Sequence, residues 1–232
     1  MLHKPTKFLI TCEHATNALP EEWAFLFENS AAVLETHRGW DPGALQLAET
    51  IANELDATLH HYPWSRLLIE PNRSLHHQSL FSEFTKKRTK SEKEQLVQQY
   101  WTPYRNRVRE VIQKMISSNR VVHISVHTFT PVLKGVNRSV DIGLLYDPKR
   151  KDEQEFCREW KKRVKLVAPK FKMRMNQPYK GSADGFTTSL RNKFLNEEYL
   201  GIELEVNQKF WFENKAKWMK IAEMLAGSLS RS

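Results

Sequence analysis

The segment Val121-Val-His-Ile-Ser-Val126, followed by His127-Thr-Phe-Thr-Pro131, carries the pattern on which the fold depends. A short, largely apolar run that stops at polar residues and a proline is typical of a buried strand. Comparable runs recur along the chain and predict further extended segments at 7–12, 57–62, 66–69, 140–146, 172–175 and 200–206.

Segments with helical spacing of apolar residues separate these runs. Pro42 and Gly43 are expected to begin one helix, and Ser91 with Glu94 predicts a capping box at the start of a longer one. Pro103 is expected to break or kink that longer helix. Other helices are predicted after Pro20, from 151 to 169, and over 218–229.

Strands that alternate with helices predict the α/β class, here a three-layer αβα sandwich around a central mixed, mostly parallel sheet. The chain has 232 residues, which favours a single domain over residues 1–232. In sheets of this kind, ligands bind beyond the carboxyl ends of the strands. Chemistry is therefore expected where the strands end.

The composition excludes several classes of protein. With 40% hydrophobic and 27% charged residues, the chain is neither low in complexity nor wholly disordered. It lacks the ~20 consecutive apolar residues of a membrane span and the apolar core of a signal peptide, so we expect a cytoplasmic protein with no membrane contact. Cys12 and Cys157 are too few for a disulfide framework or a four-cysteine zinc site, so both are expected to be reduced.

The net charge of +9, from 36 Lys and Arg against 27 Asp and Glu, favours an anionic partner. Small carboxylates and nucleic acids both qualify. Because the basic residues are scattered and form no recognisable nucleic-acid-binding module, solvated helix faces explain them better. A nucleic-acid-binding or phosphodiester-cleaving protein is kept as an alternative function.

Two histidines at predicted strand ends suggest a metal site. His14 and His127, together with the carboxylate of Asp41, would give zinc three protein ligands and leave a fourth position for water. Glu13 competes with Asp41 as the third ligand. The plainer alternatives are that His14 is a hydrogen-bonded core residue, that Asp41 only caps a helix, and that Glu13 lies on the surface.

Neighbouring residues support other roles. His123 lies in mid-strand, roughly 13 Å along the strand from His127, so only one of the two is expected to be a ligand, and His123 is expected in the core. Glu203 and Glu205 share a strand face, and Glu205 is the better candidate general base because it is nearer the strand end. A nucleophilic pair of Cys12 with His14 is a further alternative, although cysteines in apolar runs are mostly inert.

Seven short blocks, in order, resemble the N-formylglutamate amidohydrolase family. They are Cys12-Glu-His-Ala-Thr-Asn-Ala-Leu-Pro20, Trp40-Asp-Pro-Gly-Ala44, Ser65-Arg-Leu67, Asn72-Arg-Ser74, His127-Thr-Phe-Thr-Pro131, Asp141-Ile-Gly143 and Asn176-Gln-Pro-Tyr179. The resemblance implies a metal-dependent hydrolase related to zinc carboxypeptidases, with a phosphorylase/hydrolase-like αβα fold and one zinc ion, or another divalent metal, per chain. The implied reaction is cleavage of an N-formyl or N-acyl amino acid, with N-formylglutamate, which yields formate and glutamate, as the type substrate.

The resemblance also implies roles for particular residues. His14 and His127 match the histidine blocks of the family, Asp41 matches an acidic position, and Glu205 matches the glutamate that acts as general base. Substrate carboxylates are expected to be bound by cationic and polar side chains, namely Arg66, Asn72, Arg73, Arg138 and Tyr179.

The chain departs from the family at two positions. Glu70 stands where relatives have aspartate, and Asn207 stands where they often have arginine. The loss of a cation at Asn207 would change the charge that the pocket prefers. These departures motivate a third hypothesis, a member of the family that binds a ligand without catalysis.

Overall fold

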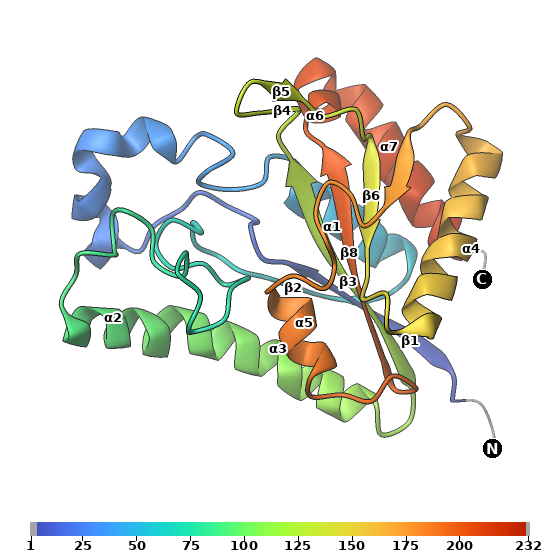
Figure 1. Cartoon of the computed structure of the whole chain (residues 1–232), viewed down its shortest axis with the longest axis horizontal. Helices are drawn as coiled ribbons and strands as arrows, with labels where there is room; N and C mark the ends of the chain where they lie inside the picture. The colour runs from blue at the N-terminus through green and yellow to red at the C-terminus, as the bar shows by residue number, and fades with distance from the viewer. Residues whose placement is uncertain (1–3, 231–232) are drawn as a thin grey trace.

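The computed structural model describes residues 4–230, and its centre is a six-stranded sheet in the order β2-β1-β3-β8-β6-β7 (Figure 1). β1, β2, β3 and β8 run parallel to one another, whereas β6 is antiparallel to β8 and parallel to β7. The prediction of a mixed, mostly parallel sheet is confirmed. The strands are β1 (Thr6–Cys12), β2 (Thr58–His61), β3 (Arg120–Phe129), β6 (Ile142–Leu145), β7 (Met173–Met175) and β8 (Tyr199–Asn207).

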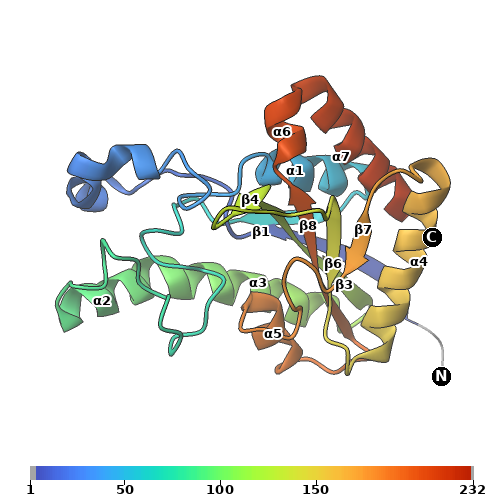
Figure 2. The same ribbon diagram turned by 45° about the horizontal axis from the view of Figure 1, so that its top comes forward.

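Helices cover both faces of the sheet, as Figure 2 shows. The core on one face is built with α1 (Ala44–Glu54), α4 (Lys151–Val167), α6 (Lys209–Glu213) and α7 (Lys215–Ser230). The core on the other face is built with α3 (Thr102–Met115) and α5 (Phe186–Arg191). The 3-10 helix η1 (Glu21–Val33), the helix α2 (Lys90–Leu96) and the hairpin β4 (Val132–Leu133) and β5 (Val136–Asn137) lie beyond the sheet. The three-layer αβα prediction is confirmed.

The register of the central strands brings their polar carboxyl ends together. Ser125 on β3 lies opposite Thr11 on β1 and Glu203 on β8. Two residues further along β3, His127 lies opposite Glu205. The turn after β1 and the ends of β3 and β8 therefore meet at one edge of the sheet.

The prediction of an extended segment at 66–69 is wrong, because these residues form a turn. The Leu68 N–H donates to the Ser65 carbonyl at 3.0 Å, and the Leu67 N–H donates to Ser65 Oγ at 3.3 Å. A serine hydroxyl that accepts from the next backbone amides favours a turn over a strand. The loop that carries Glu70 to Arg73 thus follows a turn and not a strand end.

Two details of the long helical region also differ from the prediction. The capping box uses Thr89 and Glu92, in place of the predicted Ser91 and Glu94. Both pairs fit the same sequence pattern, so spacing cannot distinguish them. Pro103 does not break the helical run, which continues from Lys90 to Met115 through a π-helical turn at Val97–Trp101 just before the proline.

The hydrophobic core holds both cysteines as free, buried thiols, as expected. Burial, together with the nearby carboxylates of Glu13 and Asp41, raises the pKa of the Cys12 thiol well above its ordinary value. Burial therefore disfavours the thiolate form of Cys12, and the ring nitrogens of His14 contact Asp41 and Glu70, which contradicts the nucleophilic pairing of Cys12 with His14. Over residues 4–230, no helix combines the length and apolar composition that crossing a bilayer requires.

A buried ion pair ties α4, α5 and β8 together, and its loss should be costly. The Glu153 carboxylate accepts from Arg191 Nε at 3.1 Å and from the Gly201 N–H at 2.9 Å. We expect Glu153→Ala to lower the free energy of unfolding by about 3–5 kcal/mol, because it leaves the guanidinium buried without its partner.

Urea denaturation would measure this loss. The matched control is Glu155→Ala, an exposed residue of the same helix, which should change stability by less than about 0.5 kcal/mol. Equal stabilities for the two variants would contradict the prediction.

Candidate metal and active site

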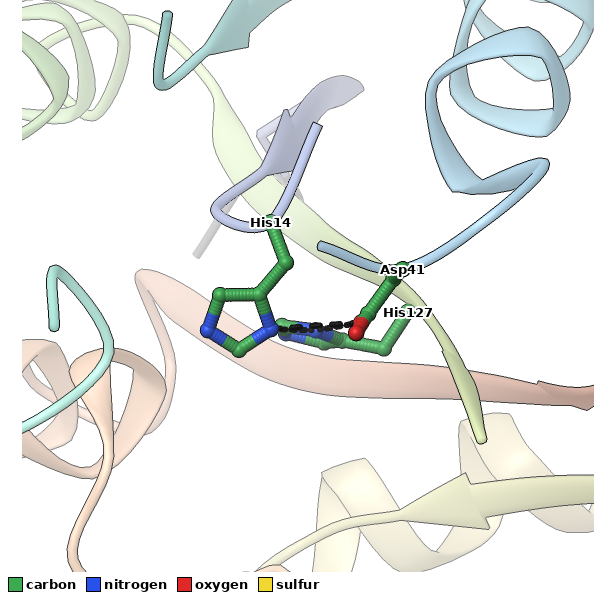
Figure 3. A group of neighbouring side chains, drawn as sticks. All are labelled: His14, Asp41 and His127. Atoms are coloured by element: carbon green, nitrogen blue, oxygen red, sulfur yellow. Dashed lines mark hydrogen bonds and ion pairs between the residues drawn. The ribbon is translucent and has the colours of Figure 1, made fainter. Parts of the chain in front are cut away.

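Three buried side chains, His14, Asp41 and His127, converge at the carboxyl edge of the sheet (Figure 3). His14 Nδ1 lies 3.2 Å from Asp41 Oδ2, and His127 Nδ1 lies 3.1 Å from the same oxygen. The two Nδ1 atoms are 3.2 Å apart. One potential ligand atom from each residue thus occupies a corner of a nearly equilateral triangle.

Separate elements supply the three side chains. His14 lies in the turn after β1, His127 lies on β3, and Asp41 lies just before α1. The N-cap of α1 is Gly43, which adopts a positive φ of 84°. The alternative that Asp41 only caps this helix is wrong, since its carboxylate instead accepts from the Thr128 N–H at 3.3 Å and points into the triangle.

A carboxylate holds the outer nitrogen of His14. His14 Nε2 donates to Glu70 Oε1 at 2.6 Å, and Arg66 Nε donates to Glu70 Oε2 at 2.7 Å. Glu70 therefore takes an orienting role in this chain, at the position where relatives have aspartate. With the proton of neutral His14 on Nε2, the lone pair of Nδ1 points into the triangle.

The outer nitrogen of His127 is held in a similar way through a serine. Ser125 Oγ donates to Glu13 Oε2 at 2.6 Å and is 2.9 Å from His127 Nε2, so it accepts from that nitrogen. Tyr104 donates to the other Glu13 oxygen at 2.8 Å. Glu13 is 0% exposed, which contradicts the surface alternative, and it lies behind His127 and not at the triangle. Glu13 and Glu70 thus occupy equivalent places behind the two imidazoles.

His123 is a core residue, as expected. Its Nε2 is 2.8 Å from Thr11 Oγ1 and its Nδ1 is 2.7 Å from the Tyr199 hydroxyl. Both ring nitrogens are occupied, so His123 takes no part in the triangle.

The triangle and the residues behind it hold three ionised carboxylates, those of Asp41, Glu13 and Glu70. Burial by itself raises the pKa of Asp41, but His14 and His127 outweigh it and hold that pKa well below its ordinary range. Burial likewise opposes ionisation of Glu13 and Glu70, yet His127 lowers the pKa of the first and Arg66 with His14 lowers that of the second. Burial lowers the pKa of His127, but Asp41 and Glu13 reverse this and raise it well above its ordinary value. All these interactions stabilise positive charge at the centre of the cluster.

The residues present fit a divalent metal. Tetrahedral ligands about 2.0–2.1 Å from a zinc ion are about 3.3–3.4 Å from one another, close to the 3.1–3.2 Å separations in the triangle. Two imidazoles and one carboxylate are a common ligand set of catalytic zinc, and partners on the outer nitrogens are typical of metal-bound histidines. Three carboxylates offset by the single guanidinium of Arg66 leave two negative charges, which a divalent cation would balance.

Glu205 lies in the same cleft, which has a volume of about 230 Å³. Burial raises the pKa of Glu205 to about 8, with Asp41 and Glu203 acting in the same direction. Its Oε2 atom is buried and has no hydrogen-bond partner among residues 4–230. A buried carboxylate oxygen without a partner is costly unless water or a ligand binds it.

Next to Glu205, the backbone of β6 and the 176–179 loop lie very close to each other. Gly143 on β6 lies opposite Glu205, and a Cβ on Gly143 would lie 2.0 Å from the Gln177 carbonyl oxygen. Only a residue without a side chain lets the 176–179 loop pass at this distance. That loop carries Tyr179 to the rim of the cleft.

Two of the three arginines predicted to bind a carboxylate, Arg73 and Arg138, carry charges that are unpaired within the described chain. Arg73 lines the cleft and donates to the Asp184 backbone carbonyl at 2.5 Å, without a carboxylate at ion-pair distance. Arg138 donates to the Tyr179 hydroxyl at 2.9 Å and lies over the ring of that tyrosine, 5.0 Å from its centre. It too forms no ion pair within residues 4–230.

Arg66 and Asn72 each use part of their side chain in a hydrogen bond within the protein. Arg66 binds Glu70 through Nε and a terminal nitrogen, although it also lines the cleft. Asn72 Oδ1 accepts from the Phe186 N–H at 2.6 Å, which leaves its amide N–H groups without a protein partner in the described chain. Asn72 can therefore donate into the cleft.

Asn207, one of the two positions named above as departures, has a structural role. Asn207 is buried, donates to the Val140 carbonyl at 2.9 Å and accepts from the Lys209 N–H at 3.0 Å. It does not line the cleft. Three charged or titratable residues that do line it were not predicted from the sequence, because no motif marks them: His37, Lys180 and Asp184. Glu203, which was ranked behind Glu205 as a general base, lines the cleft as well.

The fold and the site together define an α/β protein with a candidate metal centre and a buried carboxylate at the carboxyl edge of a mixed sheet. The family model of N-formylglutamate amidohydrolase matches residues 6–212. The chain therefore belongs to the N-formylglutamate amidohydrolase family, and this membership indicates a hydrolase of the amidase type.

Solved structures include similar proteins. The gene product Atu2144 from Agrobacterium tumefaciens is 28% identical, with a TM-score of 0.79 over 98% of this chain and 92% of its own. An N-acetylmuramoyl-L-alanine amidase from Clostridium difficile 630 is 12% identical, with a TM-score of 0.45 over 98% of this chain and 95% of its own. A metallo-carboxypeptidase from Burkholderia cenocepacia is 14% identical, with a TM-score of 0.44 over 98% of this chain and 56% of its own. A search of curated proteins finds no match.

Proposed function

We propose that this protein is a metal-dependent amidohydrolase that removes a formyl or other small acyl group from the nitrogen of a carboxylate-bearing amino acid. The observation that carries the proposal is the triangle of ligand atoms from His14, Asp41 and His127 in the same cleft as the unpartnered oxygen of Glu205. We assign these four residues as the metal ligands and the general base.

The metal site would supply one part of the chemistry. A divalent ion such as Zn²⁺ held by His14, Asp41 and His127 would polarise the amide carbonyl and lower the pKa of water from about 15.7 toward about 7. The Glu13 and Glu70 carboxylates hold the two imidazoles so that their Nδ1 lone pairs face the ion.

Glu205 would move the proton in both halves of the reaction. It accepts a proton from the water that attacks the carbonyl carbon, and it then gives that proton to the leaving nitrogen as the C–N bond breaks. The products are the acid of the acyl group, formate for a formyl substrate, and the free amino acid. Burial raises the pKa of Glu205 to about 8 without metal, and a divalent cation bound in the triangle would lower that pKa and favour the carboxylate form that accepts the proton.

The substrate carboxylates would bind at the two unpaired arginines. Arg73 with the free amide of Asn72 suits one carboxylate, and Arg138 with Tyr179 suits a second, as in an N-acylated glutamate. Arg66 is ranked behind them because Glu70 already occupies its guanidinium. The partner is therefore a small-molecule carboxylate in this proposal.

The departures from the family pattern do not disable this arrangement. Glu70 reaches His14, and Asn207 lies outside the cleft. The test is to measure release of formate from N-formyl amino acids by the zinc-loaded protein. No turnover of any N-formyl or N-acetyl amino acid, with zinc bound, would favour the hypothesis of a non-catalytic family member.

The arginine assignment makes a separate prediction. Arg73→Met should raise KM for an N-formyl amino acid by about 10- to 100-fold, because it removes charge-assisted hydrogen bonds worth about 1.5–3 kcal/mol. Steady-state kinetics would show it, with the exposed Arg109→Met as the control that changes little. An unchanged KM in Arg73→Met would show that the carboxylate binds elsewhere.

A further inference from the structure

The loop that carries Asn72 and Arg73 is held from behind by two side chains of the long helical region. Trp101 Nε1 donates to the Arg73 carbonyl at 3.0 Å. Arg105 donates to the Pro71 carbonyl at 2.9 Å. The two side chains thus donate to the backbone carbonyls on either side of Asn72.

The guanidinium of Arg105 lies between two aromatic rings. Its carbon is 4.4 Å from the centre of the Trp101 ring and 4.3 Å from the centre of the Phe186 ring. Arg105 is only 6% exposed, and no carboxylate of residues 4–230 lies within ion-pair distance of it. Trp101, Arg105 and Phe186 are called the arginine clamp below.

A buried cation without a partner carboxylate is expensive, so its retention calls for a physical reason. Burial lowers the pKa of Arg105 to about 10. This value is still well above neutral pH, so the guanidinium stays charged. Cation–π contacts are worth about 2 kcal/mol or more when desolvated, and the carbonyl of Pro71 adds a charge-assisted hydrogen bond. The charge is therefore held by groups that also fix the loop.

The helix that carries Trp101 and Arg105 departs from α-helical geometry just before Arg105. Residues Val97–Trp101 form a π-helical turn, η2, in which the Thr102 N–H donates to the Val97 carbonyl five residues back. The insertion ends at Trp101, so it sets the direction in which Trp101 and Arg105, one turn apart, leave the helix. Such turns are frequent at functional sites.

The clamp joins both sides of the carboxylate-binding end of the cleft. Phe186, its second ring, donates its backbone N–H to Asn72 Oδ1 at 2.6 Å. Arg73 reaches across to the Asp184 carbonyl at 2.5 Å, and the Ser74 N–H donates to Asp184 Oδ2 at 3.1 Å. Loops 70–74 and 183–186 therefore form one hydrogen-bonded unit around Arg105.

We infer that Arg105 is a positioning residue, which fixes the side chains of Asn72 and Arg73 for the substrate carboxylate without touching the substrate. Arg105 itself does not line the cleft, so its effect passes through the loop. The inference rests on the proposed function in naming a carboxylate as the group that is positioned.

The test compares Arg105→Met with Arg107→Met, an exposed arginine on the same helix. Arg105→Met should raise KM for an N-formyl amino acid at least about tenfold, with kcat within about threefold, because one charge-assisted hydrogen bond to the loop is lost. For the matching N-formyl amine, which lacks the carboxylate, kcat/KM should stay within about threefold. Arg107→Met should resemble the parent protein with both substrates.

Hydrogen exchange of the backbone amides of residues 72–74 gives a readout that needs no turnover. Exchange should be at least about tenfold faster in Arg105→Met than in Arg107→Met, while the zinc content stays equal. Trp101→Phe, which keeps an aromatic ring but loses the Nε1–H donor to the Arg73 carbonyl, should give a smaller change in the same direction and serves if Arg105→Met does not fold.

Equal losses with both substrates, or unchanged exchange at 72–74, would overturn the inference and leave Arg105 a general packing residue. Failure of the proposed function has a different signature, since the zinc-loaded parent protein would then turn over neither substrate. In that case the exchange experiment still decides whether Arg105 holds the loop, and unchanged affinity of Arg105→Met for a free amino acid would overturn the positioning role.

Discussion

Glu205→Gln is expected to lower kcat for an N-formyl amino acid by about 10²- to 10⁴-fold, the range that general acid–base catalysis contributes. Glutamine keeps the size and much of the polarity of the side chain but cannot accept a proton from water. The buried, unpartnered Oε2 atom and the position opposite His127 are the structural reasons for this expectation. Steady-state kinetics at saturating substrate would measure the change.

Two controls separate loss of the base from loss of the site. Zinc content of Glu205→Gln should equal that of the parent, because Glu205 is not one of the three proposed ligands. Glu197→Gln, an exposed neighbour just before β8, should retain full activity. A variant at Glu205 that keeps more than about a tenth of the parent kcat would show that another group moves the proton.

Zinc is expected to stabilise the protein, and His127→Ala is expected to abolish that effect. At a zinc concentration 100 times its dissociation constant, binding adds about 2.7 kcal/mol to the free energy of unfolding. For a chain of this length that corresponds to a rise in Tm of roughly 5–10 °C. Removal of metal with a chelator should reverse the rise.

Differential scanning calorimetry and elemental analysis would test this expectation together. The parent should retain about one zinc per chain, as expected for a single three-ligand site, and His127→Ala should retain far less. His61→Ala, an exposed histidine at the end of β2, is the matched control and should bind zinc like the parent. No stabilisation of the parent by zinc would contradict the assignment of the triangle as a metal site.

The sheet and its layers could be predicted from local patterns. The runs at 121–126 and 200–206 became β3 and β8, and the segment after Gly43 became α1. These elements follow from burial, because a strand covered on both faces needs an apolar run and a helix on a core needs an apolar face. Where two local patterns compete, as with the possible capping boxes at Thr89 and Ser91, the sequence pattern does not show which residue caps the helix.

The candidate ligands could also be named from the sequence, but their partners could not. Histidines at two strand ends indicated a metal site, whereas nothing near His14 in sequence points to Glu70, 56 positions away. The choice between Asp41 and Glu13 likewise depended on tertiary packing, which directs Glu13 to Ser125 and Asp41 to the Nδ1 atom of His127. The single-domain prediction, the cytoplasmic location and the alternative of nucleic-acid binding stay untested predictions.

The sequence by itself determined the order of strands and helices, because each element is set by the burial of its own side chains. The tertiary structure alone decided what meets at the carboxyl edge of the sheet. Strand register places His127 opposite Glu205, and packing of α3 against loop 70–74 brings Arg105 to Pro71. Such contacts join residues far apart in the chain, and they arise from the packing of whole elements and not from any local pattern.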